Sequence, residues 1–217
     1  RHPVPPGAKI EAARAASPLH RIPPCSRPPP HQMKIRKFLH SCIFIEHGDS
    51  SILIDPGEFS FIEGKLAPAD IPAADAVFLT HEHSDHYFPS ALTVITGKRK
   101  SRIVTNGSVA ALLAKEGISA EVLTPGQTTV VGSFSIEAIE APHGTLPVPV
   151  PENVGYFING TVFHPGDSLT FTLSKNPKVL FLPITAPWLA MVNAVETALR
   201  IKPEIAVPIH DAIMKDF

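Results

Sequence analysis

The sequence has few cysteines, little charge and no long apolar run. Its 217 residues include only two cysteines, Cys25 and Cys42, whose separation matches no metal-binding spacing. Two isolated thiols argue against a disulfide scaffold and favour a reducing compartment, so the expected location is the cytoplasm. No apolar run approaches the roughly 18–20 residues that span a bilayer, which argues against a membrane protein.

The charge balance also excludes several kinds of partner. Charged residues make up 18% of the chain and the formal net charge is −1. This composition favours neither nucleic acid nor an anionic membrane surface as a partner, and the oligomeric state stays open. The hydrophobic fraction of 44% is typical of a globular protein with a well-filled core.

Residues 1–32 differ from the rest of the chain. They are crowded with proline, as in Pro23-Pro24 and Pro28-Pro29-Pro30, and they show almost no apolar periodicity. Such a stretch buries too little surface to offset its ordering entropy, so it is predicted to be a disordered Pro-rich or non-native leader. A genuine Pro-rich interaction tail is the alternative. Patterned sequence begins at Met33, a candidate natural start, and residues 33–217 are expected to form one folded domain.

Short β-type runs separated by turn signals predict most of the secondary structure. Strands are expected at 34–38, 42–46, 51–54, 76–79, 102–105, 128–131, 133–139, 154–158, 161–163, 179–182 and 205–209. One helix is expected from an Asn106 cap to about Glu116, and another over 187–201 with Pro187 near its start. Gly48-Asp49 and Asn159-Gly160 predict tight hairpins. The order of elements repeats in two halves, which predicts two sheets covered by helices.

Four candidate metal ligands follow the strand predicted at 76–79: His81, His83, Asp85 and His86. Imidazole nitrogen and carboxylate oxygen are ligands that zinc accepts. On an extended segment residues 81, 83 and 85 share one face, and a following turn can bring His86 to the same centre. One tetrahedral ion cannot use all four and still keep an open position, so the spacing predicts two ions. The alternative is a polar loop with exposed histidines.

Three more candidate ligands stand at the ends of later strands. His143 follows the strand at 133–139, Asp167 follows the one at 161–163, and His210 follows the one at 205–209. Taken singly, each of them is more often an ordinary hydrogen-bonded residue. Together they share a position in the pattern, since strand ends on one rim of a sheet layer can converge on a common site.

The run His-x-His-x-Asp-His, followed by a distant His, a Gly-Asp pair and a final His, resembles the metallo-β-lactamase fold hydrolases. The resemblance covers roughly residues 33–217 and is nearest to compact bacterial members related to the ascorbate-6-phosphate lactonase branch. It implies an α/β fold, a four-layer αββα sandwich of two mixed β-sheets flanked by helices, with the metal site at one edge. It also implies one zinc on His81, His83 and His143, a second on Asp85, His86 and His210, and Asp167 bridging the two.

The predicted function is that of a binuclear zinc-dependent hydrolase, with Mn²⁺ or Fe²⁺ as alternative metals. Two ions that share a water lower its pKa towards neutrality, and the resulting bridging hydroxide cleaves an ester, lactone or phosphodiester bond in a small molecule. Asp85 is the candidate catalytic residue that orients this water, whereas Ser84 has no base beside it and is interpreted as a spacer. The alternatives are a di-iron or flavin-linked oxidoreductase of the same fold, a β-lactam hydrolase, or a metal-binding module without activity.

Two residues near the predicted site, Asp55 and Trp188, each allow two interpretations. Asp55 either forms a turn in Asp-Pro-Gly or supports the site from behind, and Trp188 either lines the substrate pocket or anchors the core. His164 is expected to lie outside the ligand set, as a hydrogen-bonding neighbour of Asp167. His40 and His47 flank a predicted strand and are expected to be structural or exposed.

Overall fold

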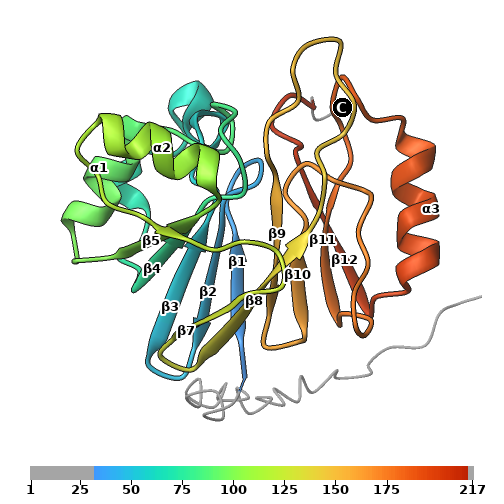
Figure 1. The fold of residues 1–217 in the computed structure, drawn as a ribbon, viewed down its shortest axis with the longest axis horizontal. Helices are drawn as coiled ribbons and strands as arrows, with labels where there is room; N and C mark the ends of the chain where they lie inside the picture. The colour runs from blue at the N-terminus through green and yellow to red at the C-terminus, as the bar shows by residue number, and fades with distance from the viewer. Residues whose placement is uncertain (1–31, 215–217) are drawn as a thin grey trace, which may run out of the picture.

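The structure is a computed structural model that describes residues 32–214. Apart from Gln32, the predicted leader lies outside the described residues, and so does Cys25. Two six-stranded sheets face each other, with helices on their outer sides (Figure 1). Within residues 32–214 no helix has the length and apolar character needed to cross a membrane.

The first sheet joins an antiparallel meander to a parallel half. Its strands are hydrogen-bonded in chain order, antiparallel from β1 to β3 and parallel from β3 to β6. Parallel neighbours require crossover connections, and these contain the helices of this half. The elements are β1 (Lys34–Lys37), β2 (Ile43–His47), β3 (Ser50–Ile54), η1 (Glu58–Gly64), η2 (Pro68–Asp70), β4 (Ala76–Phe78), α1 (Pro89–Gly97), β5 (Arg102–Thr105), α2 (Gly107–Lys115) and β6 (Glu121–Val122).

The second sheet repeats this plan. Strands β7 to β10 are antiparallel neighbours, and β10 to β12 are parallel, with α3 as the crossover between the last two. The repetition agrees with the two halves predicted from the order of elements. The elements are β7 (Thr128–Val131), β8 (Phe134–Glu140), β9 (Val154–Ile158), β10 (Val162–His164), β11 (Val179–Pro183), α3 (Met191–Ile201) and β12 (Ile205–Ile209).

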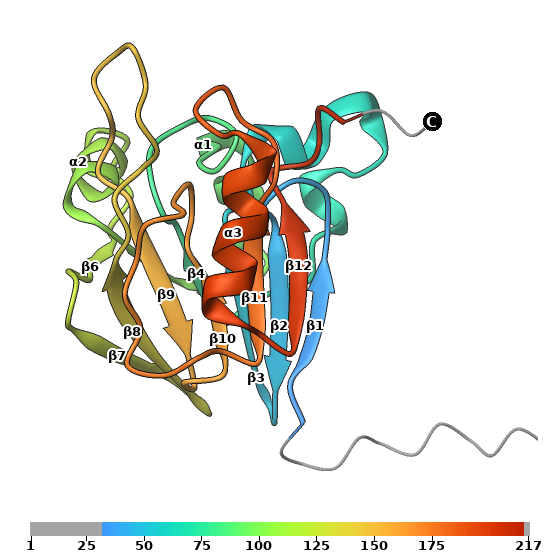
Figure 2. The ribbon, with the colours of Figure 1, turned by 90° about the vertical axis from the view of Figure 1, so that its right-hand side faces the viewer.

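Alternation along the strands fills three apolar layers. In β2, Ile43 and Ile45 enter the core between the sheets, whereas Phe44 points outward to the layer under α1 and α2. In β9, Tyr156 enters the central core and Phe157 enters the layer under α3. Successive strand residues face opposite sides, so each sheet is apolar on both faces. The predicted four-layer αββα sandwich is therefore confirmed, and Figure 2 shows α3 lying over the second sheet.

Two predicted hairpin turns and one predicted helix cap are confirmed. Gly48, with φ of 58°, lies in the turn between β2 and β3, and Asn159 (φ 49°) and Gly160 (φ 56°) form the turn between β9 and β10. Two central residues with positive φ match the right-handed twist of the strands they connect. Asn106 caps α2, since its side chain accepts a hydrogen bond from the Val109 amide at 2.9 Å.

One predicted helix begins later than expected, and one helix was not predicted. The helix expected over 187–201 begins only at Met191, because Ala186 and Leu189 pair in a tight turn that contains Pro187 and Trp188. Helix α1 was not predicted: it has Pro at its first position, no side-chain cap, and an interior rich in β-branched residues that lower helix propensity.

Candidate metal centre

Strand ends from both sheets meet at one edge of the sandwich. The histidine motif follows β4, and the other predicted ligands follow strands β8, β10 and β12. The loop after β3 packs against the backbone of the motif. The Glu58 amide donates to the Ser84 carbonyl at 2.7 Å. A Cβ on Gly57 would lie 1.9 Å from the carbonyl oxygen of Asp85. Only glycine allows this approach of two backbones.

The motif itself is a turn, not an extended segment. The amides of His86 and Tyr87 both donate to the carbonyl of His83, at 2.9 and 2.8 Å. The expectation that residues 81, 83 and 85 share one extended face is therefore wrong. The turn separates the motif into two pairs, with His81 and His83 in one cluster of candidate ligands and Asp85 and His86 in another.

The first cluster consists of His81, His83, His143 and Asp167, whose ligand atoms lie within 4.8 Å of one another. Nε2 of His81 is 3.2 Å from Nδ1 of His83, and Nε2 of His143 is 3.5 Å from Oδ2 of Asp167. Three imidazoles and one carboxylate are a ligand set that zinc accepts.

The second cluster contains Asp85, His86 and His210, as predicted, and also His40. Nε2 of His210 lies 3.0 Å from Oδ2 of Asp85 and 3.1 Å from Oδ2 of Asp167. Oδ1 of Asp167 lies 3.1 Å from Nε2 of His86. Asp167 therefore contacts both clusters, which is the position that a bridging carboxylate requires.

Three buried atoms between the clusters support metal binding. Nε2 of His86, Nε2 of His143 and Oδ1 of Asp167 have no hydrogen-bond partner among residues 32–214. Buried polar atoms are normally paired, and an atom that faces other ligand atoms without a hydrogen bond can be satisfied by a cation. The residues present thus fit a metal centre.

The outer ring nitrogens fix the orientation of three candidate ligand histidines. Nδ1 of His86 donates to Oδ2 of Asp55 at 2.8 Å, and Nδ1 of His143 donates to the carbonyl of Gly144 at 2.6 Å. Nδ1 of His210 donates to the carbonyl of Thr185. Such contacts turn Nε2 inward and select the tautomer that binds a metal. Of the two interpretations of Asp55, support of the site is the one that the structure shows.

Opposite charges within the centre shift the pKa values of its histidines and carboxylates. Burial lowers the pKa of His86, but the carboxylates of Asp167 and Asp55 outweigh burial and hold that pKa well above its usual range. Burial likewise opposes protonation of His210, yet its hydrogen bonds to Asp167 and Asp85 raise its pKa to about 9. For Asp167, burial raises the pKa, but the charge of His86 and contacts with other histidines hold it well below the usual value.

Trp188 lies beside the first cluster. Its Nε1 donates to Oδ2 of Asp167 at 3.3 Å, and its ring centroid is 5.6 Å from that of His143. A Cβ on Gly144 would lie 2.1 Å from the indole, so the ring packs directly on that glycine. Trp188 also lines a cavity of about 640 Å³ together with His143. The pocket interpretation of Trp188 agrees with this position.

The structure also brings His40 to the site, a residue that the sequence analysis did not place there. Of its two expected states, structural or exposed, exposure is wrong, because His40 is fully buried and its Nε2 lies 3.0 Å from Oδ2 of Asp85. It follows β1 at the same edge as the other ligands, so the strand-end argument used for His143 would have found it. His164 stays outside both clusters, bonded to the Ser41 carbonyl and the Gly166 amide, as expected.

The fold and the paired ligand clusters define a class of metal-binding sandwich proteins. The chain belongs to the β-lactamase superfamily: the family described as "Beta-lactamase superfamily domain" matches residues 34–210. Protein Rv0786c of Mycobacterium tuberculosis is 30% identical over 191 residues, covering 84% of this chain and 85% of its own.

Further similarities agree with this family. A UPF0173 metal-dependent hydrolase of Methylobacterium nodulans is 28% identical over 201 residues, covering 82% of this chain and 84% of its own. The solved structure of Igni18, a metallo hydrolase from Ignicoccus hospitalis, is 25% identical and has a TM-score of 0.67, covering 85% of this chain and 86% of its own. The predicted superfamily and class of enzyme, a metal-dependent hydrolase, are confirmed.

Proposed function

We propose that this chain is a binuclear zinc-dependent hydrolase that cleaves an ester, lactone or phosphodiester bond in a small molecule. The observation that supports this most is the position of Asp167 between the clusters. Its Oδ1 lies 3.1 Å from Nε2 of His86, and its Oδ2 lies 3.5 Å from Nε2 of His143. One carboxylate that faces ligands of both clusters suits two neighbouring ions better than one.

The chain supplies the ligands and orients them. His81, His83 and His143 would hold one ion, and Asp85, His86 and His210 the other, with Asp167 shared. Ions held there would supply Lewis acidity and a water of lowered pKa, and so a nucleophile near neutral pH. The Asp85 side chain is 15% exposed, whereas that of Asp167 is 2% exposed, so Asp85 is the ligand carboxylate that can also orient an attacking water.

Neither Ser84 nor Cys42 is positioned to act as an activated nucleophile. Ser84 lies within the motif, and its carbonyl serves as a backbone acceptor for Glu58. Cys42 is fully buried, and burial raises the pKa of its thiol far above the usual value, which keeps it protonated. Activated water is therefore the nucleophile that this site favours.

The cavity beside the centre supports a small substrate. Its volume of about 640 Å³ is within the range of small-molecule sites, and it reaches the centre at His143. Trp188 and Leu169 supply apolar surface, and Arg200 and Glu196 supply one charge of each sign. This combination suits a small molecule with both an apolar and a polar part. We place the enzyme in the cytoplasm, as its cysteine content predicts.

The experiment that tests this function is a panel of lactones, carboxylic esters, thioesters and phosphodiesters, assayed with zinc, manganese and iron. Asp85→Asn should abolish turnover of any accepted substrate, because it removes both a ligand and the carboxylate that orients water. Glu82→Gln is the matched control, since it makes the same acid-to-amide change in the same loop outside both clusters. An Asp85→Asn variant as active as Glu82→Gln would contradict the proposed role.

Metal analysis tests the choice of zinc. Purified protein should contain up to two zinc ions per chain and no visible absorbance. Two irons with an absorption band in the visible would support the oxidoreductase alternative instead, because imidazole and carboxylate ligands suit iron as well.

A further inference from the structure

His40 is a buried histidine outside the motif and outside the predicted ligand set. It lies in the turn between β1 and β2, and its φ of 61° is in the left-handed region. Asp55 (φ 47°) and His210 (φ 61°) share this conformation, so three of the five such non-glycine residues within 32–214 gather at the centre. Residues with a Cβ rarely adopt it, and a cluster of them at one place marks a position that the surrounding structure holds fixed.

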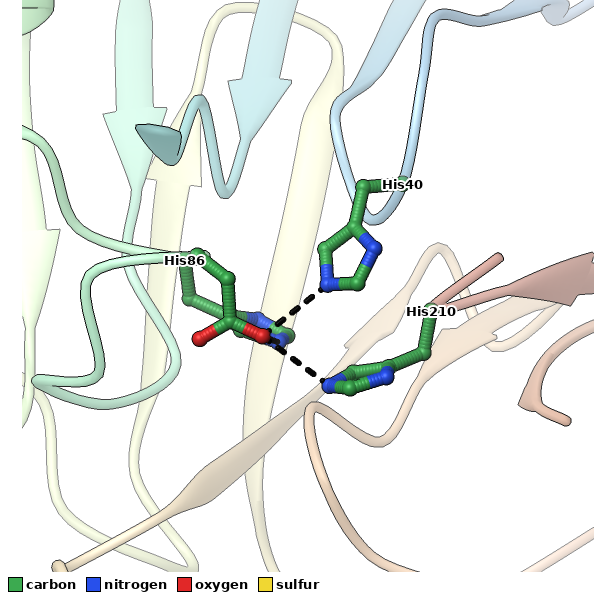
Figure 3. A group of neighbouring side chains, drawn as sticks. His40, His86 and His210 are labelled. Atoms are coloured by element: carbon green, nitrogen blue, oxygen red, sulfur yellow. Dashed lines mark hydrogen bonds and ion pairs between the residues drawn. The ribbon is translucent and has the colours of Figure 1, made fainter. Parts of the chain in front are cut away.

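The inner nitrogen of His40 faces a ligand of the second ion. Its Nε2 lies 3.0 Å from Oδ2 of Asp85, and Nε2 of His210 lies 3.0 Å from the same oxygen (Figure 3). By distance alone His40 could itself be a ligand. The hydrogen bond made by its outer nitrogen decides between a ligand and a hydrogen-bond donor.

That outer nitrogen is an acceptor. The backbone N–H of Ala212 donates to Nδ1 of His40 at 3.3 Å, so the neutral ring carries its proton on Nε2. A ligating histidine has the reverse arrangement: Nδ1 of His143 donates to the Gly144 carbonyl and leaves Nε2 bare for an ion. Nε2 of His40 therefore presents a hydrogen to the carboxylate of Asp85 and offers no lone pair to a metal.

An ion pair fixes the position of Ala212, whose backbone N–H donates to His40. Nζ of Lys37, at the end of β1, lies 2.9 Å from Oδ2 of Asp211, and both side chains are largely shielded from solvent. Asp211 immediately precedes Ala212, so this pair fixes the segment that follows β12 against β1. The turn after β1, the segment after β12 and the motif thus converge on one hydrogen bond to Asp85.

We propose that His40 is a positioning residue for Asp85 and not a metal ligand. Its Nε2–H donates to Oδ2 of Asp85 and fixes that carboxylate for the second ion. The proposal rests on the two-ion function proposed above. It predicts that loss of the donor weakens the second ion selectively, while the ion held by His81, His83 and His143 keeps its affinity.

Nitrogen-15 NMR of histidine-labelled protein tests the assignment directly. In the metal-free protein, His40 should show a protonated Nε2 and an unprotonated Nδ1. After loading with ¹¹³Cd, the histidines at 81, 83, 86, 143 and 210 should show ¹¹³Cd–¹⁵N coupling and His40 none. Coupling at His40, or a proton on its Nδ1, would overturn the proposal. If no histidine coupled to cadmium, the two-ion function would fail, and the tautomer of His40 would still decide this inference.

Two variants of one position separate a donor from a structural role. His40→Gln retains an N–H that can reach Asp85, and it should keep both ions. His40→Leu should weaken the second ion by about 10–100-fold, the usual effect of losing a hydrogen bond to a ligand. His47→Leu is the control, because His47 lies outside both clusters and should keep both ions. Equal loss of the second ion in the Gln and Leu variants would contradict the proposal.

Discussion

Nδ1 of His86 donates a hydrogen bond to Oδ2 of Asp55 at 2.8 Å, and both residues are fully buried. The same carboxylate accepts the amide of Thr80 at 2.8 Å and its hydroxyl at 2.7 Å. Asp55 thus joins the end of β3 to the start of the motif and turns Nε2 of His86 towards the proposed site of the second ion. Its effect on the metal is indirect, through the orientation and basicity of a ligand.

Asp55→Ala should therefore affect both metal binding and stability. We expect the second ion to bind about 10–100-fold more weakly, because the ring of His86 loses its anchor. The free energy of unfolding of the metal-free protein should fall by about 3–5 kcal/mol, since buried partners of the carboxylate are left unpaired. Chelator competition and urea denaturation measure the two effects.

Asp75→Ala is the control for this prediction. The Asp75 carboxylate accepts the Ser51 amide at 2.8 Å, at the opposite end of β3 from the metal centre. This variant should lose stability while retaining its metal affinity. If Asp55→Ala bound both ions as tightly as Asp75→Ala, the supporting role of Asp55 would be wrong.

Gly144→Ala should disturb the pocket wall. Its Cβ would lie 2.1 Å from the indole of Trp188, so the ring must leave its place beside His143 and Asp167. Because Trp188 is the one tryptophan of the chain, its fluorescence emission reports the change. We expect an altered emission maximum and a fall in kcat/KM of about tenfold or more.

Gly97→Ala gives the matched comparison for Gly144→Ala. Within the described part of the chain, no atom outside the helix's own backbone lies within 4 Å of the Cβ that it would add at the end of α1. This variant should leave emission and kcat/KM unchanged. If the Gly144→Ala variant had the same emission and kinetics as the Gly97→Ala variant, the predicted role of the Trp188 indole in the pocket wall would be wrong.

Metal binding should release protons. In the metal-free protein His86 and His210 have raised pKa values, so both are protonated near pH 7.5, while the pKa values of Asp85 and Asp167 are lowered and both carboxylates are ionised. Burial opposes each of these charges, and the contacts between histidines and carboxylates outweigh it. A ligating imidazole must be free of its proton, so the second ion should displace about two protons.

The direction of the pH dependence follows from the raised pKa values. Apparent affinity for the second ion should fall on acidification and increase towards pH 9, where His210 loses its proton without metal. Calorimetric titrations in two buffers of different ionisation enthalpy give the number of protons released. Identical heats in both buffers would rule out this protonation scheme.

The candidate ligands that the structure brings together could be predicted from the sequence because their signals are local. The motif places four candidate ligands within six positions, and His143, Asp167 and His210 each follow a strand that the sequence predicts. Parallel and antiparallel strands of both sheets then bring these ends to one edge. Hairpins at Gly48 and Asn159-Gly160 were predicted for the same reason, since a turn depends on two or three neighbouring residues.

Other features depend on contacts between distant parts of the chain. His40 shares the strand-end position of the other candidates, but its role depends on its partners Asp85 and Ala212, which lie 45 and 172 positions away. The late start of α3 reflects the tight turn that carries Trp188 to Gly144, a contact that propensity does not encode. The extended face assumed for the motif was wrong because the backbone bonds to His83 form a turn.

The most direct test of the central claim is anomalous diffraction from crystals of the zinc-loaded protein. We predict two zinc peaks about 3.5–4 Å apart, on either side of Asp167, one bound by His81, His83 and His143 and the other by Asp85, His86 and His210. A single zinc peak, or two peaks that Asp167 does not bridge, would contradict the two-ion account.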